Sequence, residues 1–109
     1  MEAHHNVWIE KNKSVVLSNW RVQLLKAADK SGSLAQAAKV MKVSDRTARH
    51  KLREMETALG YPLLEAGAGE GRQKSLHLTA RGRKLVDQFA VFSDGLEQEV
   101  AQRYKAAFR

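Results

Sequence analysis

Residues 33–59 read SLAQAAKVMKVSDRTARHKLREMETAL, and this stretch predicts two helices joined by a tight turn. Ser33 caps the first helix, which is short and rich in alanine, because a serine side chain accepts a hydrogen bond from a free amide at a helix start. Lys42 and Val43 make the turn, and Ser44 caps the second helix. This order is that of a helix-turn-helix.

The second helix of the pair is predicted from Asp45 to about Leu59. Apolar side chains recur along it at every third or fourth position and predict a buried face: Ala48, Leu52, Met55 and Leu59. Gly60 ends the helix, and Pro62 prevents its continuation because proline lacks the amide hydrogen that a helix needs. The other positions are polar and largely basic, so the helix presents a basic face away from its core.

Residues 19–60 as a whole predict a three-helix core, whose first helix runs to about Lys30. Before this core, residues 7–17 predict a hairpin, because two β-branched runs flank a polar turn at Asn12 and Lys13. After it, residues 62–78 predict a wing, made of two short strands and a glycine-rich loop. We therefore expect a fold that is mainly α with small β-hairpins.

Residues 80–108 predict one long helix capped by Thr79, although residues 93–95, Ser-Asp-Gly, leave open a break or bend. Unbroken, this helix is about 40 Å long, which is more than a domain of this size covers. Its apolar stripe then needs a partner, and we predict homodimer contacts at Phe89, Phe92, Leu96 and Val100. In the alternative, Leu85, Phe89 and Phe92 cover their own domain and the helix end frays.

The composition is that of one small basic domain, residues 1–109, with a formal net charge of +7. The excess charge is concentrated in residues 18–62, where nine basic side chains face four acidic ones, and such a field attracts polyanions. Cysteine is absent, which excludes disulfides and thiolate metal sites. No run of the sequence has the length of a membrane helix, and the start lacks a secretion signal. We expect a cytoplasmic, nucleoid-associated protein without a membrane partner.

The predicted partner is duplex DNA, with the helix that starts at Asp45 in the major groove. Arg46 and Arg49 are predicted to hold guanine edges, and Thr47 a base edge or a thymine methyl group. Phosphate contacts, which position the protein without specifying sequence, are predicted for Ser33, Gln36, Ser44, His50, Lys51 and Arg53.

The role of Asp45 has more than one interpretation. As a carboxylate at a helix N-terminus it is stabilising in itself, and it can pair with Arg49 one turn later. Facing DNA, it would repel phosphates unless it meets a cytosine amine. The basic face of this helix also has a plainer interpretation, as an ordinary solvated surface.

Catalysis is not expected. The four histidines, His4, His5, His50 and His77, lack ligand spacing with acidic partners, and no phosphate-binding glycine loop precedes a helix. We therefore predict no catalytic residue, no metal site and no cofactor.

Five short motifs form a linked set: residues 32–38, 43–44, 52–56, 63–65 and 78–82. They resemble the DNA-binding domain that LysR-type regulators share with the molybdate-responsive ModE regulators. The opening hairpin, with residues 7–10, and the glycine-rich wing, residues 67–71, favour the ModE-like type. The resemblance implies a winged helix-turn-helix and a symmetric dimer. It also implies that Arg72 and Lys74 of the wing lie beside the minor groove or a phosphate, the alternative for Lys74 being an ordinary exposed loop.

The chain departs from the ModE pattern in its recognition helix. Asp45 and Arg46 stand where an aromatic residue and a lysine are usual, Arg49 replaces a common tryptophan, and Glu70 enters the wing. The operator of the family therefore does not carry over. The molybdate-binding modules of the family follow its DNA-binding domain, whereas this sequence ends at Arg109. We expect no molybdate-binding domain or site in residues 1–109.

The sequence thus predicts a dimeric, sequence-specific transcriptional regulator. Repression is the expected direction, because a second domain that recruits polymerase is not expected. Two other functions stay open at this point. A winged helix can be a protein-docking module, although docking surfaces are poor in charge at their centre. A basic domain can also package nucleic acid without reading its sequence.

Overall fold

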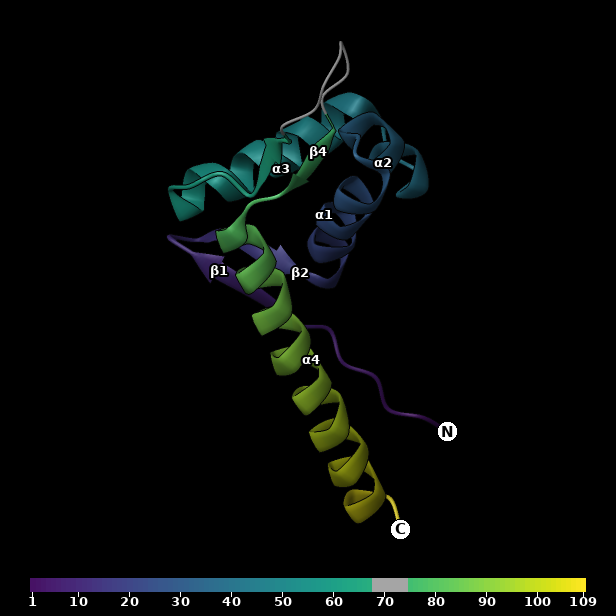
Figure 1. Cartoon of the computed structure of the whole chain (residues 1–109). Helices are drawn as coiled ribbons and strands as arrows, with labels where there is room; N and C mark the ends of the chain where they lie inside the picture. Colours follow the sequence, from purple (N-terminus) through teal and green to yellow (C-terminus); the bar gives the residue numbers. More distant parts are fainter. Residues whose placement is uncertain (68–74) are drawn as a thin grey trace.

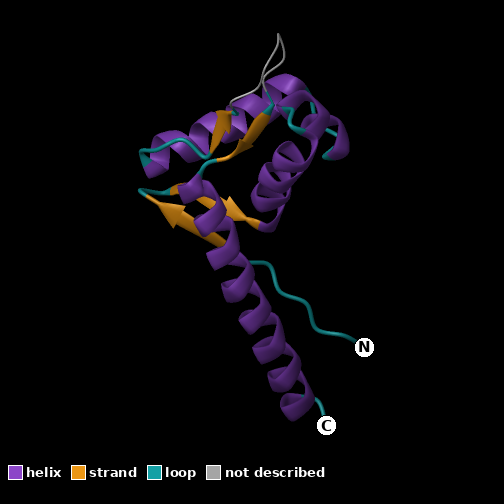
Figure 2. Ribbon diagram, in the orientation of Figure 1, coloured by secondary structure: helices purple, strands orange, loops and turns teal. Residues whose placement is uncertain are grey.

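The computed structural model describes residues 1–67 and 75–109 of the chain. Helices make up most of it, together with two small antiparallel hairpins (Figure 2). The element order is β1 (Trp8–Lys11), β2 (Ser14–Ser18), α1 (Asn19–Ser31), α2 (Leu34–Val40), α3 (Asp45–Leu59), β3 (Leu64–Ala66), β4 (Leu76–Leu78) and α4 (Ala80–Ala107). The predicted fold class, a winged helix-turn-helix with an N-terminal hairpin and a long C-terminal helix, is confirmed.

Local capping sets the helix boundaries. A hydroxyl oxygen accepts a hydrogen bond from the backbone N–H three residues later at the start of each helix, namely at Ser18, Ser33, Ser44 and Thr79. Gly32 and Gly60 end α1 and α3 with φ of 74° and 86°, a left-handed conformation that glycine adopts without steric cost. Helix α3 spans Asp45–Leu59, the range expected from the sequence, and α1 ends at Ser31, one residue after the expected Lys30.

The β1–β2 hairpin turns at the two residues predicted. Asn12 and Lys13 both have positive φ, 54° and 66°, as a two-residue hairpin turn requires. Val16 and Leu17 of β2 are buried, whereas β1 is exposed along its whole length. The hairpin therefore attaches through β2, which contacts α1 and α3.

The core lies between the three central helices. Leu24 and Leu25 of α1 pack with Met55 of α3, and all three side chains are fully buried. The small side chains of α2, Ala37 and Ala38, are also fully buried, so α2 approaches its neighbours closely. Since α2 and α3 share this core, the angle between them is set by packing.

The wing is attached to α1 rather than standing free. The N–H of Leu76 in β4 donates to the carbonyl of Gly32 at 2.8 Å, and the N–H of Leu78 donates to Asp29 at 2.9 Å. The first wing strand begins at Leu64 instead of Pro62, because Pro62 has no amide hydrogen and the N–H of Leu63 donates to Oε2 of Glu56 at 2.6 Å rather than to β4. The tip of the wing, including Arg72 and Lys74, lies outside the described residues.

Helix α4 is continuous through residues 93–95, so the break left open by the sequence does not occur. Its first turns cover the core through Val86 and Phe89, and the rest projects from the globular part (Figure 1). The principal extents are 61 × 28 × 24 Å. The chain therefore consists of a small three-helix body with one protruding helix.

Candidate nucleic-acid interface

Helix α3 has two faces of opposite character. Ala48 and Met55 on one face are fully buried, and this face anchors the helix to the core. Four exposed basic side chains, together with Asp45, line one concavity on the other side: Arg46, Arg49, His50 and Arg53. The structure thus brings five of the predicted contacts of this helix together on one surface, whereas Thr47 and Lys51 are not among the residues that line it.

The orientation of α3 is secured by an ion pair that the sequence analysis missed. Nη2 of Arg21 in α1 donates to Oε1 of Glu54 in α3 at 2.6 Å, and Nη1 donates to the carbonyl of Lys51 at 3.4 Å. Arg21 is only 6% exposed. Its guanidinium lowers the pKa of the Glu54 carboxyl below the ordinary range, against the opposing effect of partial burial.

A signal for Arg21 was present in the sequence. Position 21 falls in the same helical stripe as Leu24, Leu25 and Ala28, so an arginine there is directed toward the core. A buried guanidinium requires an acidic partner. Which carboxylate supplies it depends on the packing of α1 against α3, which the sequence alone does not specify.

The first turn of α3 is pre-arranged by its own cap. Oγ of Ser44 accepts from the N–H of Thr47 at 3.1 Å and lies 3.0 Å from the Thr47 hydroxyl oxygen. With Ser44 as the donor to that oxygen, the hydroxyl proton of Thr47 stays available for a base or phosphate acceptor. Asp45 is exposed beside them, and within the described ranges it forms no ion pair with Arg49.

Two of the remaining predicted contacts, Ser33 and Gln36, lie at the start of α2. Ser33 is half-buried and caps α2, where its Oγ accepts from the N–H of Gln36 at 3.2 Å, while the Gln36 side chain is exposed. His50 lies with Nε2 at 3.4 Å from Oε2 of Glu54, so Glu54 is shared between Arg21 and His50.

A second concavity adjoins the first and was not anticipated. It lies between the hairpin and the outer face of α3, and its lining residues are Lys11, Asn12, Ser14, His50, Arg53, Glu54, Thr57 and Ala58. His50 and Arg53 line both concavities. Figure 1 shows the β1–β2 turn beside the C-terminal end of α3.

The predicted dimer contacts on α4 differ in accessibility. Phe89 is 3% exposed and belongs to the chain's own core, so it is not available to a partner. Phe92 packs edge-on against Phe89, with ring centroids 6.4 Å apart, and stays 43% exposed. Leu96 and Val100 are partly exposed on the protruding part of the helix.

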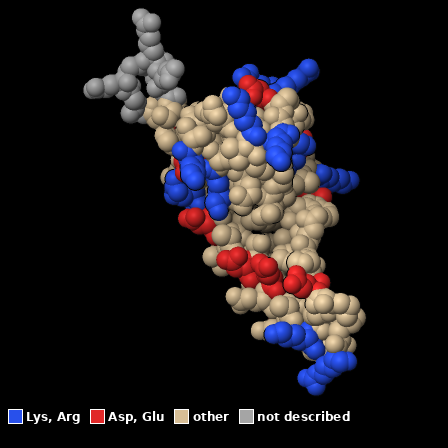
Figure 3. All heavy atoms as spheres, turned by 90° about the vertical axis from the view of Figure 1, so that its right-hand side faces the viewer, with Lys and Arg blue, Asp and Glu red and all other residues tan. Residues whose placement is uncertain are grey.

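Charge is distributed unevenly along the molecule. In the view of Figure 3, Lys and Arg side chains gather over the globular part, a band of Asp and Glu follows on the protruding part, and basic side chains return at its tip. The acidic residues of α4 are Asp87, Asp94, Glu97 and Glu99. The body that carries α3 is therefore the part suited to a polyanion.

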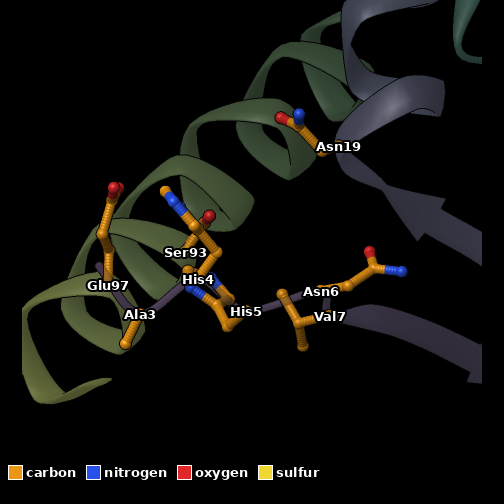
Figure 4. A pocket seen from close by; sticks show the side chains of 8 residues that line it. All are labelled: Ala3, His4, His5, Asn6, Val7, Asn19, Ser93 and Glu97. Carbon is orange, nitrogen blue, oxygen red and sulfur yellow. The ribbon is translucent and has the colours of Figure 1, made fainter. Parts of the chain in front are cut away.

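A separate pocket lies between the N-terminal segment and α4. His4 and His5 of the N-terminal segment line it with Ser93 and Glu97 of α4 (Figure 4). His4 lies 3.5 Å from Glu2. In residues 1–67 and 75–109, no group of three or more His, Cys, Asp or Glu side chains is placed to hold a metal ion.

No helix of the described part combines the length and the apolar character needed to cross a membrane.

Comparison with known proteins places this geometry in a family. Residues 20–83 match the model of the bacterial regulatory helix-turn-helix proteins of the lysR family. The N-terminal hairpin lies outside the matched residues. A search of curated proteins found no match to the sequence.

Solved structures resemble the fold. A CbnR DBD–DNA complex is 26% identical, with a TM-score of 0.60 over 82% of this chain and 95% of that chain. A BenM DBD complex with benA site 1 DNA is 18% identical, with a TM-score of 0.60 over 81% and 93%. DarR of Vibrio fischeri in complex with DNA is 16% identical, with a TM-score of 0.62 over 84% of this chain and 30% of that chain.

Proposed function

This chain belongs to the lysR family of bacterial regulatory helix-turn-helix proteins, and we propose that it is a sequence-specific regulator that binds duplex DNA as a homodimer. The chain acts in this proposal as one DNA-binding unit, and its place of action is the nucleoid. The likeness to the CbnR DBD–DNA complex, at 26% identity, supports duplex DNA as the partner.

One observation carries the proposal: the exposed basic face of α3 belongs to a helix whose opposite face packs into the core and which an ion pair joins to α1. The buried stripe of α3 and the 2.6 Å contact between Arg21 and Glu54 remove freedom from the helix before any ligand arrives. Side chains on a fixed helix lose less entropy on binding than side chains on a mobile segment. A prearranged row of arginines suits recognition of base edges better than loose attraction of phosphate.

The proposed roles follow the position of each side chain. Arg46 and Arg49 present planar guanidinium groups that can hold guanine O6 and N7 together, and Thr47 offers a hydroxyl donor. His50 and Arg53 lie further along α3 and contact phosphates, as do Ser33, Ser44 and Gln36 at the two helix starts. Asp45 either stabilises the start of α3 or meets a cytosine amine. Arg72 and Lys74, in the undescribed tip of the wing, are proposed to contact the adjacent backbone.

Dimerisation is proposed through the protruding part of α4. Phe92 at 43% exposure and Val91 at 75% exposure leave an apolar surface that its own domain does not cover. A second copy would bury it and would place two α3 helices on two half-sites of one duplex.

Two finer assignments complete the proposal. Within the lysR family match, the ModE-like type rests on the N-terminal hairpin and the glycine-rich wing sequence, without a molybdate site in residues 1–109. Repression is proposed as the direction of regulation, because occupying a promoter requires only the DNA contacts described above. The DarR complex is described in terms of transcriptional activation, so a reporter gene must decide: expression that falls when the protein is deleted would contradict repression.

The deciding experiment is selection of bound sequences from a pool of random duplexes, followed by a salt titration of the winners. A palindromic consensus with half-sites about one helical turn apart supports the proposed dimeric regulator. An unselective pool with a steep salt dependence would contradict it in favour of nucleic-acid packaging. Failure to bind any duplex would leave a protein-docking module as the function.

A further inference from the structure

The β1–β2 hairpin has one strand packed against the core and one strand exposed to solvent. The family match begins at residue 20, so residues 1–19 are an addition to the matched helix-turn-helix. Only β2 contributes buried side chains, Val16 and Leu17, while β1 and the turn are exposed. Strand β2 thus packs against the core, whereas β1 and the turn are accessible to a partner.

The turn is rigid and positively charged. Asn12 and Lys13 adopt the left-handed conformation of a two-residue turn, so the chain reverses direction within these two residues. Lys11 and Lys13 flank Asn12, and all three are exposed. A tight turn of this kind presents its two ammonium groups from a defined place on the surface.

This place adjoins the face of α3 proposed to enter the DNA groove. Lys11 and Asn12 line the same concavity as His50 and Arg53, which also line the concavity shared with Arg46. The two depressions therefore share His50 and Arg53 in their linings. A duplex seated on α3 brings its sugar-phosphate backbone along this side.

The one acidic group in the second concavity does not oppose an anion strongly. Glu54 is bound to Arg21 at 2.6 Å and lies 3.4 Å from His50, so its charge is already compensated. The net character of the concavity between the hairpin and α3 is basic.

We infer that the β1–β2 turn is a phosphate clamp, in which Lys11, Lys13 and Arg53 hold the backbone of the same duplex that α3 reads. The inference rests on the proposed function, because it needs a duplex on α3. It adds an interaction surface at the opposite end of α3 from its capped first turn, within a part of the chain that the family match does not include.

The test compares two variants that each lose two positive charges. Lys11→Gln/Lys13→Asn neutralises the hairpin turn, and asparagine at position 13 tolerates the left-handed conformation. Lys105→Gln/Arg109→Gln removes the same charge from the far end of α4. Binding of all three proteins to the best selected duplex is followed by fluorescence anisotropy over a salt series, with thermal unfolding as a check of folding.

The hairpin variant is expected to bind roughly tenfold more weakly near physiological salt. Its log–log salt slope should become shallower by about 3.6, since the proposed dimer loses four phosphate contacts, two in each protomer, and each removes about 0.9. Its base preference should be unchanged. The α4 variant should keep the slope of the unmodified chain. Phosphate ethylation interference should lose symmetry-related positions in both half-sites of the footprint in the hairpin variant alone.

Three outcomes would overturn the inference. Equal slopes for the unmodified chain and the hairpin variant would show that the turn makes no phosphate contact, while leaving the proposed function intact. Equal losses in both variants would assign the effect to the general field of the molecule. Absence of duplex binding by the unmodified chain would overturn the proposed function and the clamp together.

Discussion

Arg21 of α1 and Glu54 of α3 form an ion pair at 2.6 Å, although 33 positions separate them in the sequence. Arg21 is almost fully buried, with 8% of its side chain exposed, whereas the Glu54 side chain is 34% exposed. The pair therefore joins the core helix to the helix that presents the basic face, and it determines how α3 is oriented toward a ligand.

Removing this guanidinium should destabilise the fold and loosen α3. In Arg21→Met the apolar stem is retained, but Glu54 and the Lys51 carbonyl lose their donor. We expect the free energy of unfolding in urea to fall by about 1–3 kcal/mol, the usual cost of leaving partly buried groups unpaired.

The matched control for that variant is Arg103→Met. Arg103 also contacts a carboxylate, Glu99, at 2.7 Å, but the two side chains are 80% and 52% exposed. An exposed pair contributes at most about 1 kcal/mol, and often nothing measurable. Equal losses for the two variants would contradict a special role for Arg21.

Acid should weaken the junction between α1, the wing and α4. The N–H of Leu78 and the guanidinium of Arg83 lower the pKa of the Asp29 carboxyl, although partial burial opposes them. The folded-state pKa thus lies below the ordinary value of about 3.9. The stabilisation is complete above that value and is lost as the pH falls through the folded-state pKa.

Asp29→Asn tests this pH dependence, because asparagine keeps an acceptor for Leu78 but cannot ionise. Unfolding free energies are measured from neutral pH down to about pH 2. The difference between the unmodified chain and Asp29→Asn should shrink across the acidic end of that range. Asp94→Asn on the exposed part of α4 is the control and should follow the unmodified chain. A constant difference for Asp29→Asn would refute the linkage.

Gly82 should not tolerate a methyl group, whereas Gly95 in the same helix should. A Cβ at Gly82 would lie 2.5 Å from the backbone carbonyl oxygen of Leu63, which cannot move aside, while a Cβ at Gly95 meets nothing within 4 Å. We expect Gly82→Ala to destabilise by about 1–3 kcal/mol. Gly95→Ala should stabilise by about 0.5–1 kcal/mol, since alanine favours a helix interior. Thermal unfolding measures both, and a neutral Gly82→Ala would show that α4 shifts freely on the wing.

Most of the fold was predictable because its helix boundaries are local. Ser33 and Ser44 act on amides three residues away, and Gly60 acts on its own turn of helix. The hairpin turn at Asn12 and Lys13 is equally local. The start of β3 was misplaced because the N–H of Leu63 donates to Glu56 of α3 at 2.6 Å and not to β4, and no strand pattern in the sequence encodes that contact.

The candidate site was predictable only in part. The spacing of Ala48 and Met55 identifies the buried face of α3, and so the exposed position of Arg46 on the opposite face follows from helix geometry alone. The concavity shared by Lys11 and Arg53 depends on how the hairpin docks on α3, which involves residues far apart in the sequence.

Specific recognition makes different predictions for two arginines of α3. Arg46→Ala should lose about 1–3 kcal/mol at particular base pairs of the selected consensus and relax preference there. Arg53→Ala, which removes one proposed phosphate contact from each protomer, should weaken binding evenly over sequences and reduce the salt slope of the dimer by about 2. Competition between the consensus and single-base variants distinguishes the two. An even loss in Arg46→Ala would argue that this arginine does not read bases.

Substitutions of the two neighbouring phenylalanines of α4 should have different effects, one mainly on folding stability and the other mainly on dimer formation. Phe89 is 3% exposed and Phe92 is 43% exposed, although their rings are in contact. Phe89→Ala removes a core side chain and should cost about 3–5 kcal/mol of unfolding free energy. Phe92→Ser removes a side chain that is 43% exposed, so it should cost clearly less unfolding free energy than Phe89→Ala and should shift a dimer toward monomer in sedimentation velocity. A dimer that persists in Phe92→Ser at the lowest measurable concentration would place the interface elsewhere on the chain.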